Sequence, residues 1–203
     1  MKINYFDLGL HKEANEVDMF IRICIENNIE YNIYGIEAHP NYCTQLRKKY
    51  EKLNNVTIIN KAISNANAPV KLYINYSFDG QGNSIFSTKH NVTEDYVMVD
   101  GIRFSDLLKE IRPNFKNENN ILRFNIEGAE WHLMNNLDEE NLLKYFKIIL
   151  GINDMHKISE LEPNLNEYNK ILEKNNIKIE RYCENKQWLN VDLLKSIKQN
   201  FKL

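Results

Sequence analysis

The stretch ILRFNIEGAEWHLM, from Ile121 to Met134, decides the expected fold. Its first residues are mostly apolar and rich in β-forming types, which is typical of a buried strand. Glu127-Gly128 then ends the strand, and helix-forming residues continue to Met134. A strand that passes through a glycine turn into a helix is half of a βαβ unit. The stretch therefore predicts an α/β fold.

Three polar side chains follow this strand, those of Asn125, Glu127 and Glu130. In open α/β sheets ligands bind outside the carboxyl ends of the strands, so all three are candidate site residues. The alternative is structural: Glu127 caps the helix and Glu130 is a solvated acid of its first turn, both favoured by the helix dipole. Taken alone, the stretch favours the structural interpretation.

The rest of the chain repeats the alternation of strands and helices. Such alternation indicates one doubly wound, mostly parallel sheet, and 203 residues favour a single domain spanning 1–203. The expected strands are 3–8, 31–36, 56–63, 70–74, 96–99, 121–126, 145–152, 177–182 and 188–191, and the expected helices are 14–26, 104–111, 129–134, 165–174, 191–201 and one that begins at Pro40. The polar segment 77–93, with two glycines, is expected to be a long loop that acts as a mobile lid.

Composition narrows the class of protein and its partners. The net charge is -2 and no long basic run occurs, which argues against a nucleic-acid groove or an anionic membrane surface. No apolar run is long enough to span a bilayer, and the start of the chain does not resemble a signal peptide. Three cysteines without zinc-ligand spacing fit a reducing compartment. We therefore expect a cytoplasmic protein, and leave open a homo-oligomer.

The first strand and the turn after it are expected to bind a nucleotide-like ligand, as in other doubly wound folds. The chain reads DLGLHKEANE here, with Asp7 at the strand end and Gly9 allowing close approach of the backbone. The second strand ends in Glu37, whose carboxylate would accept hydrogen bonds from both ribose hydroxyls; the alternative is a solvated loop acid. The absence of GxGxxG and GxxxxGK[ST] motifs argues against NAD, FAD and a P-loop NTPase.

With these residues laid out, the chain resembles the FkbM family of S-adenosylmethionine-dependent methyltransferases, from Tyr5 to about His156. The motifs that carry the resemblance are FDLG (6–9), YGIEAHP (34–40), NKAIS (60–64), GNSIF (82–86) and above all NIEGAEW (125–131). The resemblance implies a class I methyltransferase fold with a seven-stranded, Rossmann-like sheet whose last strand is antiparallel. It also implies S-adenosylmethionine as cofactor and methylation of a hydroxyl on a sugar, glycan or other small molecule.

Site residues carry over from the family by position. Asp7, Gly9 and Glu37 would hold the cofactor, and Ala62 and Ile63 would flank its adenine. The substrate side would be formed by Ser84, Asn125, Glu127, Glu130 and His156. The chain departs from the family pattern where it has His11 for Asn, Glu13 for Gly, Arg123 for Lys, Asn125 for Asp, and Asn153 or Asp154 for Glu.

Methyl transfer to a hydroxyl requires that the acceptor be oriented, that water be excluded and often that a proton be removed. Glu127, Glu130 and His156 are the candidate bases, and His156 has the most suitable ordinary pKa, although it could equally be a structural histidine. No metal is assigned to the site. Two alternatives stay open: an inactive methyltransferase-fold protein that binds a ligand or partner, and a metal-dependent hydrolase that uses the same three residues.

Overall fold

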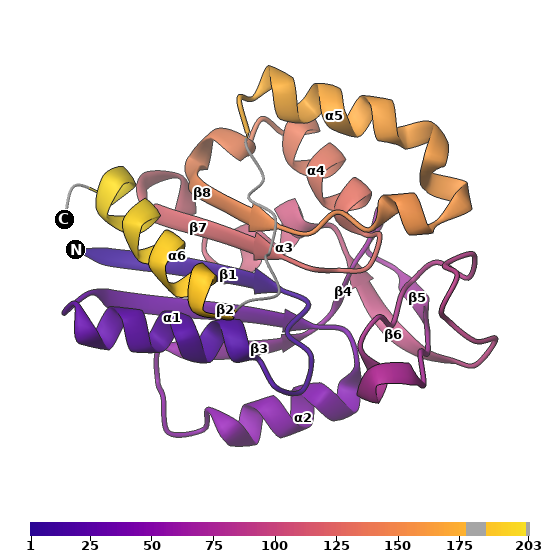
Figure 1. Cartoon of the computed structure of the whole chain (residues 1–203), viewed down its shortest axis with the longest axis horizontal. Coiled ribbons are helices and arrows are strands. Elements are labelled where there is room, and N and C mark those ends of the chain that lie inside the picture. The colour runs from indigo at the N-terminus through magenta and orange to yellow at the C-terminus, as the bar shows by residue number, and fades with distance from the viewer. Residues whose placement is uncertain (178–185, 202–203) are drawn as a thin grey trace.

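The computed structural model describes residues 1–177 and 186–201, without the side chains of residues 78, 79 and 186–192. Its central sheet has five parallel strands in the order β3-β2-β1-β7-β8 (Figure 1). These strands are β1 (Lys2–Leu8), β2 (Glu30–Glu37), β3 (Val56–Asn60), β7 (Asn119–Phe124) and β8 (Phe146–Gly151). The expected α/β class with a mostly parallel sheet is confirmed, and the stretch that begins at Ile121 supplies one of its inner strands.

A second sheet of three strands stands beside the first, in the order β4-β6-β5. β4 (Ala62–Ile63) pairs parallel with β6 (Tyr96–Ile102), and β5 (Pro69–Tyr73) pairs antiparallel with β6. The expected seven-stranded main sheet is therefore wrong for the described residues. The expected strand 56–63 divides between the two sheets because Asn60 turns its side-chain amide onto the carbonyls of Glu37 and Ala38, at 2.9 and 2.8 Å.

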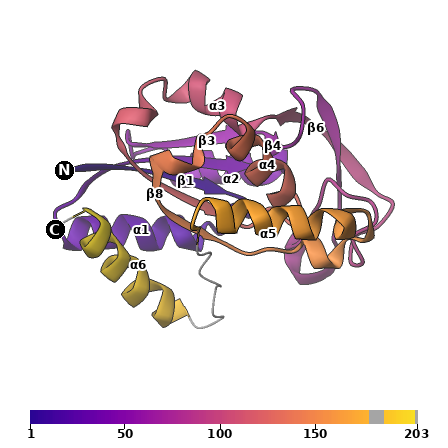
Figure 2. The ribbon, with the colours of Figure 1, turned by 90° about the horizontal axis from the view of Figure 1, so that it is seen from above.

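Helices cover both faces of the central sheet (Figure 2). Side chains from α1 (Asn15–Glu26), α2 (Pro40–Lys49) and α6 (Lys186–Phe201) pack with one face in one apolar cluster. Side chains from α3 (Phe104–Ile111), α4 (Glu130–Glu139) and α5 (Leu165–Lys174) pack with the other. Short 3₁₀ helices complete the chain: η1 (Ser77–Gly80), η2 (Phe115–Asn117), η3 (Leu143–Tyr145), η4 (Met155–Lys157) and η5 (Ser159–Asn164).

The last part of the chain differs from expectation. The strand expected over 188–191 is wrong, because α6 already begins at Lys186. Its buried residues Leu193, Ile197 and Phe201 recur every four positions, which is the helical period. The strand expected over 177–182 falls almost wholly outside the described residues. No helix in the described ranges is both long and apolar enough to cross a membrane.

Candidate functional site

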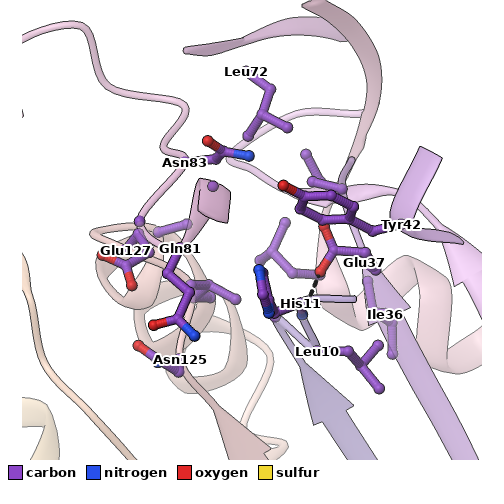
Figure 3. A pocket seen from close by; sticks show the side chains of 18 of the residues that line it. Leu10, His11, Ile36, Glu37, Tyr42, Leu72, Gln81, Asn83, Asn125 and Glu127 are labelled. Carbon is purple, nitrogen blue, oxygen red and sulfur yellow. Dashed lines mark hydrogen bonds between the residues drawn. The ribbon is translucent and has the colours of Figure 1, made fainter. Parts of the chain in front are cut away.

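A cavity of about 240 Å³ lies at the carboxyl ends of the central strands (Figure 3). Its walls come from the turns that follow β1, β2 and β7, from β4, and from the start of the polar segment after β5. Because all five central strands are parallel, their carboxyl ends meet at one edge, which is where open α/β sheets bind ligands. The cavity is therefore the candidate site.

Glu37 lies in the cavity wall, at the end of β2, as expected. Its two carboxylate oxygens accept backbone N–H groups, from His11 at 2.8 Å and from His39 at 2.7 Å. Burial raises the pKa of Glu37, and four nearby backbone N–H groups, led by those of His39 and His11, oppose that rise. Glu37 thus joins the first two turns of the sheet and still presents an acid to the cavity.

Gly9 also lines the cavity, at the turn after β1. Its φ is +83°, and a Cβ there would lie 2.0 Å from the backbone oxygen of Asn125. Only glycine permits this conformation and this approach without strain. Gly9 therefore lets the turns after β1 and β7 come together, which is the close backbone approach that the sequence suggested.

Asp7 occupies a different place from the one expected. It does not line the cavity but is buried behind it, with its Oδ1 2.8 Å from Nη1 of Arg123. Arg123 does line the cavity, and the same nitrogen donates to the carbonyl of Gly9 at 3.0 Å. Burial raises the pKa of Asp7 to about 6, although the Arg123 charge acts in the opposite direction. Asp7 thus acts on the site through Arg123.

The expected adenine-flanking residues are both in the cavity wall. Ala62 and Ile63 form β4, and each is nearly fully buried. Ile36, from β2, and Leu72, from β5, add further apolar surface to the lining. Part of the cavity is therefore suited to a flat apolar group, next to the polar contact offered by Glu37.

Tyr42, from α2, borders the cavity near Glu37 (Figure 3). Its ring stacks on His39 at 4.3 Å and meets the edge of His11 at 5.1 Å, measured between ring centroids. A Cβ added to Gly80 would lie 2.0 Å from the Tyr42 hydroxyl oxygen. Tyr42 thus connects α2 to η1, and nothing in the sequence pattern singled it out.

Glu127 lines the cavity and sits in a left-handed backbone conformation, with φ of +56°. Its carboxylate is 2.8 Å from the ammonium of Lys89, and the acid of Asp154 is a near neighbour that raises its pKa. Burial raises the pKa of Glu127, against the effect of Lys89. Burial alone would raise the pKa of Asp154 too, but its interactions with Glu127 and Lys157 bring that pKa below its usual value.

Glu130 is fully buried and does not line the cavity. Its carboxylate accepts the backbone N–H groups of Ile126 at 3.0 Å and Gly128 at 2.6 Å. It therefore closes the turn between β7 and α4 by accepting two backbone N–H groups that precede the helix. The sequence suggested either a base that faces the substrate or a solvated acid, and the buried position of Glu130 is neither of these. Burial raises its pKa to about 8.

Ser84 and Asn125 take different roles. Ser84 is buried outside the cavity lining, and its hydroxyl donates to the carbonyl of Glu127 at 2.7 Å, so its role is to hold that turn. Asn125 does line the cavity, as expected. Its Oδ1 is buried and has no hydrogen-bond partner among the described residues. A ligand with a donor group would satisfy that oxygen.

His156 is exposed on η4 and is not among the residues that line the cavity. The expected pairing of Glu127 with His156 is therefore not formed, and Asp154 stands beside Glu127 in its place. Within the described ranges, no group of three or more His, Cys, Asp and Glu side chains is arranged to hold a metal ion. The hydrolase alternative needed Glu127, Glu130 and His156 at one point, and the structure does not bring them together.

Comparison with known families gives one match. The family model for the methyltransferase FkbM domain matches residues 7–190, which is most of the chain. No curated protein and no solved structure matches the chain.

Proposed function

The chain belongs to the FkbM methyltransferase family, and we propose that it transfers a methyl group from S-adenosylmethionine to a hydroxyl of a sugar, glycan or other small molecule. The observation that carries the proposal is Glu37, a buried acid at the carboxyl end of β2 that faces a cavity. An acid at that position is suited to a ribose, whose two hydroxyls are hydrogen-bond donors.

The residues around Glu37 fit an adenosine group. Ala62 and Ile63 supply the apolar wall that an adenine ring requires, and they lie in the same cavity as Glu37. At the turn after β1, the missing Cβ of Gly9 leaves the backbone close to Asn125, and Arg123 places a positive charge in the lining. That charge would favour the carboxylate of the cofactor's methionine part.

Glu127 is the residue that we assign to the acceptor. Figure 3 shows Glu127 and Glu37 on different walls of the cavity, so an acceptor beside Glu127 need not displace the ribose. S-adenosylmethionine supplies an electrophilic methyl group on a sulfonium. The Glu127 carboxylate would accept a hydrogen bond from the acceptor hydroxyl, orient its oxygen and take its proton. Asn125 would add a hydrogen bond through its buried, unpartnered Oδ1.

A second function has one observation in its favour, the turn after β1, where His11 and Glu13 replace the Asn and Gly of the family pattern. His11 has a φ of +55° and its ring lies inside the cavity (Figure 3), while Glu13, also in the lining, adds an acid. A ligand-binding protein without methyltransferase activity would retain cofactor-like binding at Glu37 but produce no methylated product. Incubation with labelled S-adenosylmethionine and a panel of sugars separates the two functions.

The test of the proposal is calorimetry with S-adenosylmethionine on the wild type and on Glu37→Ala. We expect Glu37→Ala to weaken binding by about 1.5–3 kcal/mol, the range for hydrogen bonds to a charged group. S-adenosylhomocysteine has the same ribose, so its affinity should fall by the same factor in Glu37→Ala. Glu26→Ala, which removes an exposed acid at the end of α1, is the control and should bind as the wild type does. An unchanged dissociation constant in Glu37→Ala would reject the ribose assignment.

A further inference from the structure

Lys89 is a lysine whose charged end is almost completely buried, with 1% of its side chain exposed. All three of its N–H donors have acceptors: the carbonyl of Gly82 at 2.8 Å, Oδ1 of Asn91 at 2.7 Å and Oε2 of Glu127 at 2.8 Å. A buried ammonium is costly unless it is fully paired. Lys89 meets that requirement, and one of its three partners is the Glu127 carboxylate, which we assign to the acceptor.

The segment from Ser84 to Lys89 holds the backbone of Glu127 as well as its side chain. Ser84 donates its hydroxyl to the Glu127 carbonyl at 2.7 Å, five residues before Lys89 reaches the carboxylate. Glu127 has a left-handed φ of +56°, which a residue with a Cβ adopts at a cost in strain and only when its surroundings enforce it. Lys89 is itself fixed by an antiparallel bridge to Ile158. The segment thus fixes where the Glu127 carboxylate points.

The other charges around Glu127 come from two elements. Asp154, at the start of η4, is a neighbouring acid that raises the pKa of Glu127, and it is 2.8 Å from the ammonium of Lys157. Glu130, in the first turn of α4, is a second nearby acid. Of these groups, Lys89 alone brings a positive charge into direct contact with the Glu127 carboxylate within the described ranges, since Lys157 contacts Asp154.

We propose that Lys89 is the positioning residue of the acceptor site: its ammonium holds the Glu127 carboxylate in place and favours its ionised form, which can accept a hydrogen bond from the acceptor hydroxyl. The proposal rests on the proposed function in one respect, the assignment of Glu127 to the acceptor. The ionised state matters because a protonated carboxyl group would offer its own proton to the hydroxyl instead of accepting one. Burial and the neighbouring acid favour that protonated form, and Lys89 opposes both.

The test is the titration of the Glu127 side-chain carboxyl carbon by NMR, in protein labelled at glutamate and without any ligand. Glu127→Gln identifies the signal. In Lys89→Met we expect the midpoint to move to higher pH by about 1–3 units, the size of the effect of an adjacent opposite charge. Lys61→Met is the matched control, because Lys61 is also in the cavity wall but pairs with Asp100 at 3.0 Å. In Lys61→Met the titration midpoint of Glu127 should stay near that of the wild type. Equal midpoints in the wild type and Lys89→Met would overturn the proposal.

Lys89→Met leaves Glu127 without its partner and is expected to lower the unfolding temperature, so a second variant keeps the test usable. In Lys89→Met/Glu127→Gln the carboxylate is replaced by a neutral amide, which needs no ammonium. We expect this double variant to recover part of the stability that Lys89→Met loses. Strict additivity of the two substitutions would overturn the coupling. Calorimetry with S-adenosylmethionine tests the proposed function separately, because neither the titration nor the unfolding experiment requires cofactor or acceptor.

Discussion

At the scale of single residues, Asp7 and Arg123 form a buried ion pair beside the cavity. Both side chains are nearly fully buried and lie 2.8 Å apart. We predict that Arg123→Met destabilises the protein by about 3–5 kcal/mol, because it leaves Asp7 as an uncompensated buried charge. Urea unfolding measures the loss. Asp7→Asn/Arg123→Met should be more stable than Arg123→Met alone, whereas Arg22→Met, at an exposed position of α1, should change little.

The sequence located part of the cavity lining because it located the strand ends. Gly9, Glu37 and Asn125 follow buried strands, and parallel strands bring their carboxyl ends to one edge. The direction of a side chain within a turn is a different matter. Glu130 turns back to cap the N–H groups of Ile126 and Gly128, a choice decided by local hydrogen bonds that spacing does not reveal.

The partners of Glu127 were the least predictable part of the site. Lys89 lies in a polar segment with no periodic pattern, and its burial depends on three acceptors that are brought together only in the folded chain. The sequence favoured His156 for its ordinary pKa, but η4 exposes His156 and directs Asp154 to Glu127. Two residues of chain separate the expected partner from the observed one, which is finer than sequence patterns resolve.

At the scale of elements, segment 77–93 is more firmly held than a lid without contacts would be. Its later part forms a bridge between Tyr73 and Ser84, and the N–H of Thr93 donates to the carbonyl of Ile74 at 2.9 Å. At its start, Gly80 comes close to Tyr42 of α2. Residues 77–83 are held as well, because the carbonyls of Gln81 and Gly82 accept hydrogen bonds from the side chains of Asn75 and Lys89 at 2.6 and 2.8 Å.

We predict that Gly80→Ala separates this part of the segment from α2. The new Cβ would lie 2.0 Å from the Tyr42 hydroxyl oxygen, and the φ of +82° adds strain. Hydrogen exchange followed by mass spectrometry should show faster exchange over 77–83 in the variant, with residues 84–93 unchanged. Tyr42→Phe removes the clashing oxygen, so Tyr42→Phe/Gly80→Ala should exchange more slowly than Gly80→Ala. Equal rates in the wild type and Gly80→Ala would contradict this account.

Strand boundaries failed where tertiary contacts overrode the local pattern. Residues 56–63 are apolar enough to form one strand, yet the Asn60 amide fixes the chain at the end of β2 and β4 joins another sheet. Residues 188–191, Trp-Leu-Asn-Val, are a short and mostly apolar stretch, and such stretches do not distinguish a strand from a buried helix. There α6 prevails, because Leu193, Ile197 and Phe201 continue a helical stripe onto the central sheet.

At the scale of the whole molecule, the chain places its buried acids at one edge. Figure 1 shows the central strands running toward a common edge beside the second sheet, and Asp7, Glu37, Glu127 and Glu130 all lie at or just beyond those strand ends. Burial raises the pKa of each of them. The edge that would bind the ligand is thus also a part of the fold whose stability responds to pH.

The last prediction uses Glu130, whose pKa burial raises from 4.5 to about 8. A raised pKa means that the folded state binds the proton more tightly than the unfolded state does. This stabilisation is fully present below the unfolded pKa and is lost as the pH rises through the folded pKa. Glu130→Gln stays neutral throughout. Between pH 4.5 and about 8, the wild type should therefore lose stability relative to the variant by about 1.4 kcal/mol for each pH unit.

Urea unfolding of both proteins across that pH range measures the difference directly. His39 and His132, whose pKa values burial lowers, change stability in the opposite direction over part of the range. They are present in both proteins, so their effect cancels in the difference, as does that of Asp7. A difference in unfolding free energy that stays constant with pH would mean that Glu130 is ionised in the folded protein throughout, held so by the N–H groups of Ile126 and Gly128.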